Sequence, residues 1–273
     1  MGNYIGVCHI HSVHSDDGLL SIAELARFFK ERDYHFGCLT DHSPKNDGTF
    51  IGSREMAEIV QECRTVSDEK FVMVPGLECA AFDDAHILAI GITEAIQSKD
   101  WKTIVHEIHA QGGYAVLAHP LFFERRYPWE NLKMLDGIEV WNGNKFINFP
   151  DISASLMLKK LRKNGHALSG IFGLDFHRHE NYKQLSIIIS EDELSVKSVV
   201  QALKIGGFLL HSARFETDSL AEFSPVNRWK WYCLGWLFFK SRNLAKRIQS
   251  MLEKMGIKIP EPLLKIPRKF YYH

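Results

Sequence analysis

Apolar and polar positions along the chain follow two different periods that alternate. Short apolar runs rich in β-branched residues predict strands, and stretches with apolar residues three or four apart predict amphipathic helices. The predicted strands cover residues 4–10, 35–40, 70–76, 85–91, 114–118, 134–141, 167–173, 184–190 and 207–210. The predicted helices cover residues 21–33, 53–66, 101–111, 152–165 and 192–206. This alternation predicts an α/β architecture with a largely parallel sheet.

The overall composition is that of an ordinary globular protein. Of the 273 residues, 45% are hydrophobic and 24% are charged, which is sufficient for a sizeable core. No segment has the pattern of a signal peptide, and no apolar run is long enough to predict a membrane span. The cysteines are scattered and form no CxxC pair, which favours reduced thiols and a cytoplasmic location. They are Cys8, Cys38, Cys63, Cys79 and Cys233.

The C-terminal segment differs from the rest of the chain in charge. From Ser224 onward there are eleven Lys and Arg residues against two Glu, although the whole chain balances 33 basic with 33 acidic residues. We therefore expect one domain over residues 1–223 and a basic, aromatic extension over residues 224–273. The extension could pack on the main domain, self-associate, lie at a membrane surface or contact a nucleic-acid backbone. Its aromatic residues include Trp229, Trp231, Tyr232, Trp236, Phe238 and Phe239.

The first predicted strand ends in a short stretch that is rich in metal-binding side chains, "GVCHIHSVHSDDG". His9 and His11 occupy alternate positions, so an extended chain would aim both imidazoles at the same side. Two neutral imidazoles can bind one ion, and Asp16 could add a carboxylate oxygen. The alternative is a pair of core or surface histidines followed by a turn aspartate. We interpret His14 and Asp17 as solvated loop residues.

Similar side chains follow the later predicted strands. The strand ends of a parallel barrel build one face, so residues far apart in sequence would converge there. Each of these residues could instead have a structural role when taken alone. Asp41 could orient a ligand imidazole or be a turn aspartate. Glu139 could likewise orient a ligand imidazole or be a barrel-lining acid. Trp141 could stack on a substrate or be a packed aromatic. The further candidate ligands are His42, Glu78, His86, His119, Asp175 and His177.

The motifs "HIHSVHSDDG", "TDHS", "PGLE", "AHIL", "AHP" and "GLDFH" resemble, in this order, the polymerase and histidinol phosphatase (PHP) metallohydrolase family. The resemblance implies a distorted (β/α)7 barrel of the PHP type, here with the C-terminal helical extension. It also implies two or three divalent transition metal ions, zinc, manganese or iron. The family's Ser-Asp-Gly is Ser15-Asp16-Asp17-Gly18 here, so Asp17 is an alternative to Asp16. The implied ligands are His9, His11, Asp16, His42, Glu78, His86, His119, Asp175 and His177.

These features predict a metal-dependent phosphoesterase that hydrolyses a small phosphorylated substrate, a phosphomonoester or nucleotide, with a metal-bridging hydroxide. Three cations against three carboxylate ligands leave positive charge for a phosphate dianion. Nucleic acid is a possible but not favoured substrate. The alternatives are a nuclease, a carbamate- or carboxyl-ester hydrolase using the same centre, and a binding module without catalysis. Residues expected to assist catalysis or hold the substrate anion are Asp41, Glu139, Arg178 and His179, with Arg54, Arg125 and Arg126 as further cations.

Overall fold

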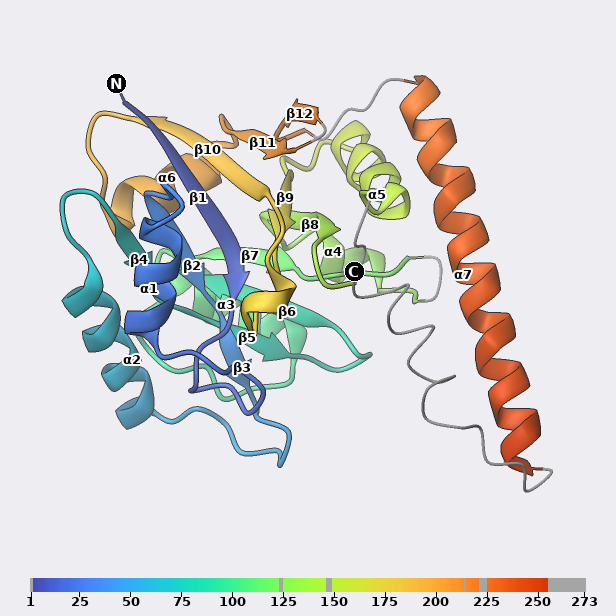
Figure 1. Ribbon diagram of the computed structural model, residues 1–273, viewed down its shortest axis with the longest axis horizontal. Coiled ribbons are helices and arrows are strands. Elements are labelled where there is room, and N and C mark those ends of the chain that lie inside the picture. The colour runs from blue at the N-terminus through green and yellow to red at the C-terminus, as the bar shows by residue number, and fades with distance from the viewer. Residues whose placement is uncertain (1, 123–124, 146–148, 214, 221–224, 255–273) are drawn as a thin grey trace.

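The strands form two mixed six-stranded sheets (Figure 1). The computed structural model describes residues 2–122, 125–145, 149–213, 215–220 and 225–254. The first sheet has the order β12 (Phe215–Asp218), β11 (Leu209–Ser212), β10 (Leu185–Glu191), β1 (Gly2–Ile10), β2 (Phe36–Leu39) and β4 (Val72–Val74). The second has the order β3 (Asp41–Ser43), β5 (Gly76–Ala80), β6 (His86–Ile90), β7 (Tyr114–Leu117), β8 (Gly137–Asn142) and β9 (Ser169–Gly173).

The two sheets are joined where strands pass from one to the other. Only Thr40 separates β2 from β3, and only Pro75 separates β4 from β5. The end of β1 also pairs with the segment after β9 through a parallel bridge between Ile10 and Phe176. The ends of β1, β3, β5 and β9 are thereby brought together. The α/β class is confirmed, whereas these pairings do not show a closed (β/α)7 barrel.

The expectation of a largely parallel sheet holds for only part of the molecule. β1 and β2 are parallel, as are β7, β8 and β9. In contrast, β6 is antiparallel to both β5 and β7. β10 is antiparallel to both β1 and β11, and β11 is antiparallel to β12. Residues 81–85 are too few for a crossover helix, so β5 and β6 must form a hairpin. The reversal of β6 then returns β7 to the direction of β8.

The predicted helices are confirmed with small changes at their ends. They are α1 (Ile22–Lys30), α2 (Ser53–Val66), α3 (Trp101–Ala110), α5 (Ile152–Lys163) and α6 (Val196–Ile205), with the short α4 (Trp129–Leu132) and the 3₁₀ turn η1 (His179–Asn181) in addition. Ser21 and Glu24 form the expected capping box at the start of α1. Gly206 ends α6 in the left-handed conformation, with φ of 76°, which glycine adopts at low cost.

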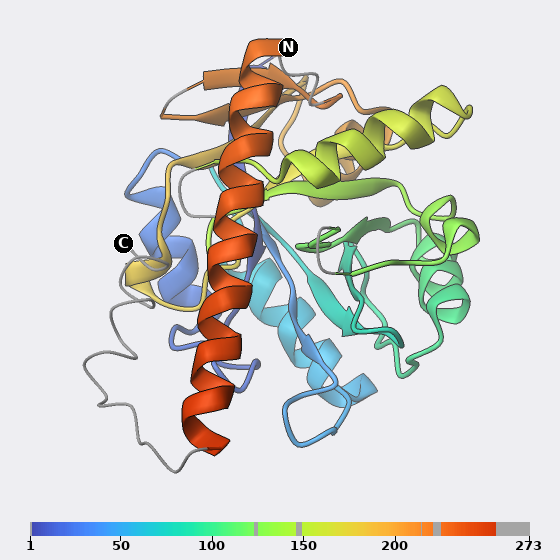
Figure 2. The same cartoon turned by 90° about the vertical axis from the view of Figure 1, so that its right-hand side faces the viewer.

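The last helix, α7 (Pro225–Lys254), runs along one side of the molecule outside α5 (Figure 2). Its Trp231 is 9% exposed, and α7 packs against α5. None of the described helices is long and apolar enough to cross a bilayer. The predicted boundary at residue 223 lies outside the described residues. All five cysteines are free, and all except Cys233 are buried.

Candidate metal centre

The carboxylate of Glu78, in the middle of β5, is the hub of the histidine cluster. It is 1% exposed, and five imidazoles surround its two oxygens. Oε2 lies 3.1 Å from His9 Nε2, 3.4 Å from His11 Nε2 and 3.2 Å from His42 Nδ1. Oε1 lies 2.6 Å from His86 Nδ1 and 3.1 Å from His119 Nε2. Each oxygen thus has its own group of histidines, an arrangement suited to a carboxylate that bridges two cations.

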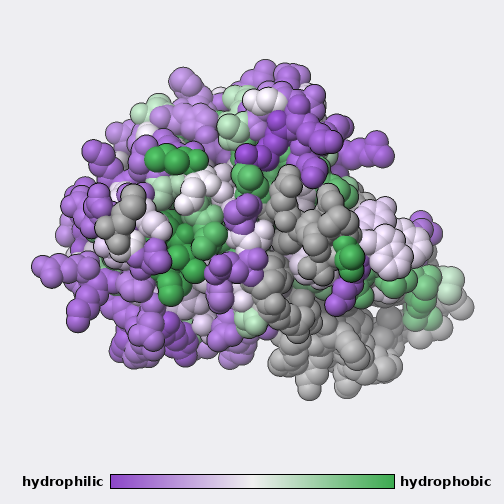
Figure 3. Space-filling model, turned by 90° about the horizontal axis from the view of Figure 1, so that it is seen from above, coloured by the Kyte–Doolittle hydropathy of each residue, from purple (hydrophilic) through white to green (hydrophobic). Residues whose placement is uncertain are grey.

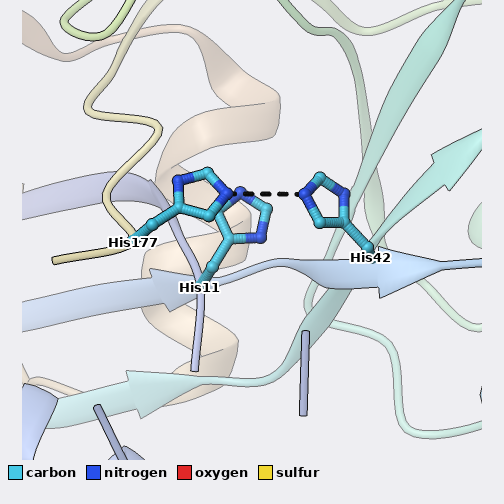
Figure 4. Close-up of side chains that lie close together, drawn as sticks. All are labelled: His11, His42 and His177. Atoms are coloured by element: carbon cyan, nitrogen blue, oxygen red, sulfur yellow. Dashed lines mark hydrogen bonds between the residues drawn. The ribbon is translucent and has the colours of Figure 1, made fainter. Parts of the chain in front are cut away.

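Three imidazoles converge at the outer side of Glu78 (Figure 4). His177 Nδ1 donates to the carbonyl of Asp175 at 2.9 Å, so its Nε2 has a lone pair. His42 Nδ1 faces Glu78, which leaves a lone pair on Nε2 of the neutral ring. These two Nε2 atoms are 3.4 Å apart, and the buried Nε2 of His11 has no hydrogen-bond partner. Converging lone pairs repel one another unless a proton or a cation lies between them.

A buried hydrogen-bond chain fixes the tautomer of His11. The Ser15 hydroxyl donates to Asp41 at 2.8 Å, so its oxygen can accept from His11 Nδ1, which lies 3.2 Å away. The backbone N–H and hydroxyl of Ser12 also donate to Asp41, at 2.6 and 2.8 Å. Asp41 therefore orients His11 through Ser15 rather than contacting the cluster itself. Its pKa is raised by burial, which the bonds from Ser12 and Ser15 only partly offset.

Glu139, on β8, orients the inner histidines. Its Oε1 accepts from His9 Nδ1 at 2.9 Å. Its Oε2 accepts from the His119 backbone N–H at 2.6 Å and from Asn142 Nδ2 at 2.9 Å. A Cβ on Gly173 would lie 1.6 Å from Oε1, so β9 needs glycine at this position for the carboxylate to fit. This is the orienting role that the sequence suggested for Glu139.

The backbone at three of the candidate ligands is left-handed. The φ values are 63° at His9, 27° at His119 and 53° at Asp175. Non-glycine residues rarely adopt this region, and such strain concentrates at functional sites. At His9 the pairing of β1 with β2 shifts register, so a bulge aims its ring, not simple alternation along a strand. The His9 and His11 rings still meet, with centroids 5.1 Å apart.

The loop before α1 brings Asp17, not Asp16, to the cluster. Asp17 Oδ2 is 3.2 Å from His177 Nε2, and Oδ1 is 3.5 Å from His42 Nε2. The exposed carboxylate of Asp16 instead accepts a bond from the backbone N–H of Asn46. Neighbouring side chains diverge in the tight turn that Ser15 begins. The loop therefore directs the second aspartate of "SDDG", and not the first, toward the histidine cluster.

The charges of the cluster fit divalent cations. Burial raises the pKa of Glu78, but the charges of His9 and His86 outweigh it and hold the pKa well below its usual range. Burial likewise lowers the pKa of His42, but the hydrogen bond to Glu78 outweighs it and raises the pKa. The protons on the histidines around Glu78 thus occupy positions that divalent cations would fill. The buried Oδ2 of Asp175 has no hydrogen-bond partner, and its Oδ1 lies 3.7 Å from both His9 and His11.

Three overlapping triads have ligand atoms that all lie within 4.8 Å of one another. They are His9, Glu78 and His119; His9, His11 and Asp175; and His11, His42 and His177. Neutral imidazole with carboxylate oxygen is a donor set typical of zinc, manganese and iron sites. The cluster indicates divalent metal binding without fixing the metal or the number of ions.

In the described part of the chain, no hydrogen bond or ion pair joins the other proposed substrate residues to the cluster. The His179 ring, at the start of η1, packs against Phe28 of α1 with centroids 4.8 Å apart and an angle of 44° between the ring planes. Arg178 is exposed at the start of η1. Trp141 is 4% exposed and packs edge-on against Phe172, as a core aromatic does. The remaining cations also lie elsewhere: Arg54 is exposed and pairs with Glu58, Arg125 donates to the carbonyl of Asp84, and Arg126 is exposed.

Sequence reasoning missed a cation at this site, Lys145. Its Nζ lies 3.7 Å from Asp175 Oδ2, and its side chain is 44% exposed. Its backbone N–H donates to Asn142 Oδ1 at 2.8 Å, and Asn142 in turn binds Glu139. The signal was the turn "NGNK" directly after the strand that contains Glu139. A turn at that strand end positions its lysine at the rim of the cluster.

Comparison with solved structures relates this fold to known proteins. A two-domain protein of Bacteroides vulgatus ATCC 8482, containing a predicted PHP-like metal-dependent phosphoesterase, aligns with a TM-score of 0.63 and 18% identity, over 79% of this chain and 66% of that one. PsfC of Pseudomonas syringae PB-5123 aligns with a TM-score of 0.58 and 13% identity, over 78% of this chain and 93% of that one. Endonuclease Q, in complex with a duplex carrying an abasic lesion, aligns with a TM-score of 0.52 and 12% identity, over 76% of this chain and 58% of that one.

Neither a family model nor a curated protein matches the sequence. At these identities the likeness concerns the fold, and the shared part is less than the full length of the Bacteroides protein. The order of motifs pointed to the same fold from the sequence alone. The chain therefore has the fold of a PHP-like protein, with the histidine and carboxylate cluster at the ends of its strands.

Proposed function

We propose that this chain is a PHP-type metal-dependent hydrolase that cleaves phosphate esters of a small molecule. The observation that supports it most directly is the convergence of three imidazole lone pairs beside the buried carboxylate of Glu78. The Nε2 atoms of His42 and His177 are 3.4 Å apart, and a divalent cation could replace the proton between them. The PHP-like phosphoesterase of the Bacteroides protein supports the same reaction class.

The cations would be held by the residues of the three triads together with His86 and Asp17. When bound, divalent ions lower the pKa of a water molecule toward neutrality and stabilise the charge on phosphate oxygens. The protein orients the ligands: Glu139 fixes His9, Ser15 with Asp41 fixes His11, and the Asp175 carbonyl fixes His177. Each bond keeps one ring nitrogen protonated and the other directed at the centre.

Charge favours a small anionic substrate over a nucleic acid. Residues 1–223 contain 22 Lys and Arg against 31 Asp and Glu, so the main domain would repel a long polyanion. Lys145 provides one positive charge at the rim of the cluster, enough for a single phosphate. Nuclease activity, suggested by the likeness to Endonuclease Q, is the second candidate. Hydrolysis of carbamate or carboxyl esters by the same centre is the third.

We also infer that the strands form the distorted (β/α)7 barrel that the motif resemblance implies. The bridge between Ile10 and Phe176 supports closure between β1 and β9. Backbone bonds on both sides of it add support: His11 N–H donates to Phe176 at 2.8 Å, and Leu174 N–H donates to Cys8 at 2.9 Å. A barrel would explain why ligands from β1, β3, β5, β7 and β9 gather at one end.

The reaction is tested with the full chain after chelation and reloading with zinc, manganese or iron. We expect a loaded protein to hydrolyse phosphomonoesters faster than phosphodiesters or uncharged esters, and the chelated protein to be inactive. His11→Gln should abolish the metal-dependent activity, and His106→Gln, at an exposed position on α3, is the matched control. Equal, poor hydrolysis by loaded and chelated protein would exclude the proposal. Activity that rises with oligonucleotide length would favour a nuclease.

Lys145 offers a test of the substrate's charge. Lys145→Met keeps an unbranched side chain that is one atom shorter, and it removes the positive charge. We expect KM for a phosphomonoester to rise about tenfold or more, because hydrogen bonds to charged groups are among the stronger ones. Lys133→Met, which loses only a surface pair with Glu130, is the control. Loss of bound metal from the Lys145→Met variant would instead mean that the lysine holds Asp175 in position to bind metal.

A further inference from the structure

Helix α7 exposes a row of large apolar side chains to solvent. Six of them, between 45% and 73% exposed, are Trp229, Trp236, Leu237, Leu244, Ile248 and Met251. In Figure 3, pale and green atoms mark the edge where α7 lies, and a second group of green atoms lies on the main body among purple ones. An exposed apolar surface of this size on a folded domain is typical of an interaction site.

These side chains lie on one side of the helix, away from the main domain. Trp229, Trp236 and Leu244 follow one another at intervals of seven and eight residues, which are close to two turns. Trp231, the buried aromatic that packs inward, lies on the opposite side of the helix axis from Leu244. The apolar row is therefore not covered by α5 or by the sheets.

The same helix is strongly basic. Residues 225–254 contain seven Lys and Arg residues against one acidic residue, Glu253. Lys240 and Arg247 are exposed and lie eleven and eighteen residues after Trp229, which are whole numbers of turns. Both cations therefore lie in line with Trp229, on the same side of the helix as the apolar row. Lys240 Nζ also lies 5.5 Å from the centroid of the Trp236 ring.

The charge decides among the surfaces that could cover this row. A second copy of α7 would bring Lys240 and Arg247 together with their own counterparts and remove them from water, which is costly. A nucleic acid would neutralise the charge but would leave the aliphatic side chains of Leu244, Ile248 and Met251 in water. A bilayer with anionic headgroups provides both an apolar layer and phosphates. Tryptophan prefers the boundary between these layers, and lysine extends from it to the headgroups.

We propose that α7 binds the surface of an anionic phospholipid bilayer, lying in the interface with its apolar row inserted, and so holds the main domain at a membrane. This proposal does not depend on the reaction proposed for the metal centre. A basic helix of this length with Trp and Leu on one face is typical of interfacial anchors. The main domain is acidic, so α7 would also keep the repelled body oriented away from the lipid phosphates.

Co-flotation of the full chain with vesicles tests the proposal. We expect binding to phosphatidylcholine vesicles that contain phosphatidylglycerol, weaker binding to phosphatidylcholine alone, and release by salt. The double variant Trp229→Ser/Leu237→Ser should bind at least about tenfold more weakly, because it removes two inserted apolar groups. Lys240→Gln/Arg247→Gln should weaken binding about 25-fold, since each cation near an anionic surface contributes about fivefold.

Matched controls separate insertion from general stickiness. Ile205→Ser removes an apolar side chain of α6 that is 69% exposed and should leave vesicle binding unchanged. Circular dichroism verifies that the variants remain folded. Three outcomes would overturn the proposal: no vesicle binding by the unaltered chain, a dimer in light scattering that only the apolar variant dissociates, or vesicle binding unaffected by either double variant. Binding to a duplex oligonucleotide in place of vesicles would also overturn it.

Discussion

Buried carboxylates occur in two settings in this molecule, and their environments have opposite effects. Asp151, at the start of α5, is 2% exposed; its Oδ1 accepts bonds from Ser153 and Ala154, and its Oδ2 has no partner. Glu78 and Asp175 are equally buried but lie among imidazoles. Burial raises the pKa of Asp151 to about 6. Burial also raises the pKa of Glu78 and of Asp175. The charge of His9 outweighs it, and both pKa values are held below their usual range.

The comparison of these carboxylates separates the effect of burial on a pKa from the effect of the surrounding histidines. A carboxylate enclosed without positive charge tends toward its neutral form, because desolvation disfavours the anion. The strands around Glu78 and Asp175 provide imidazoles whose lone pairs can bind cations that keep both carboxylates ionised. Asp151 has serine and backbone donors, which suit a helix cap. The pKa values therefore differ because the neighbouring side chains differ, and not because one carboxylate is more deeply buried than another.

Replacing Glu78 should have the largest effect. Glu78→Gln preserves the shape of the side chain, but its amide lacks the negative charge and the second acceptor oxygen of the carboxylate. We expect loss of bound metal and a fall in kcat/KM of more than about 100-fold, the upper range for a group that merely orients a ligand. Elemental analysis and steady-state kinetics measure both. Glu62→Gln, at an exposed carboxylate that pairs with His14, is the control. Full metal content in the Glu78→Gln variant would mean that the carboxylate of Glu78 is not needed for metal binding.

Replacing Glu139 should have the next largest effect. Both of its oxygens accept from donors, so Glu139→Gln must place an amide N–H against His9, His119 or Asn142. We expect metal affinity to fall about 10- to 100-fold, as for other partners of ligand histidines. Competition with a metal-sensitive dye measures the affinity. Unchanged affinity would mean that the left-handed backbone alone aims His9.

The sequence predicted the elements and most of the cluster because both depend on local patterns. Helix α1 follows from Ser21 and Glu24, and the candidate ligands follow from side chains at strand ends. The left-handed conformation of His9 depends on a register shift between β1 and β2, which no local pattern encodes. Lys145 reaches Asp175 only because a turn folds back over the cluster. The position of His179 beside Phe28 likewise depends on the turn η1.

Adjacent aspartates in the loop before α1 give a matched test of the outer side of the cluster. Asp17 lies beside His42 and His177, whereas Asp16 is bonded to the Asn46 backbone at the surface. We expect Asp17→Asn to lower metal affinity about tenfold, because its carboxylate is half exposed and its removal leaves the histidines in place. Asp16→Asn should change affinity less than twofold. Metal titration of both variants decides between them, and a reversed order would return the ligand role to Asp16.

Asp151→Asn should have no effect on metal binding and should change only the pH dependence of stability. The folded-state pKa of Asp151 is raised to about 6, so the folded protein retains a proton that the unfolded chain releases near pH 4. Wild-type stability is therefore lost as pH rises from about 4 to about 6 and stays lower above that range. The asparagine cannot ionise and still caps α5. Relative to wild type, its free energy of unfolding should thus rise between these pH values, by up to about 3 kcal/mol for a shift of this size. Urea unfolding of both proteins with chelator present, so that metal release does not contribute, measures the difference. A constant difference across the pH range would mean that Asp151 ionises normally, and burial without nearby positive charge would then not raise its pKa.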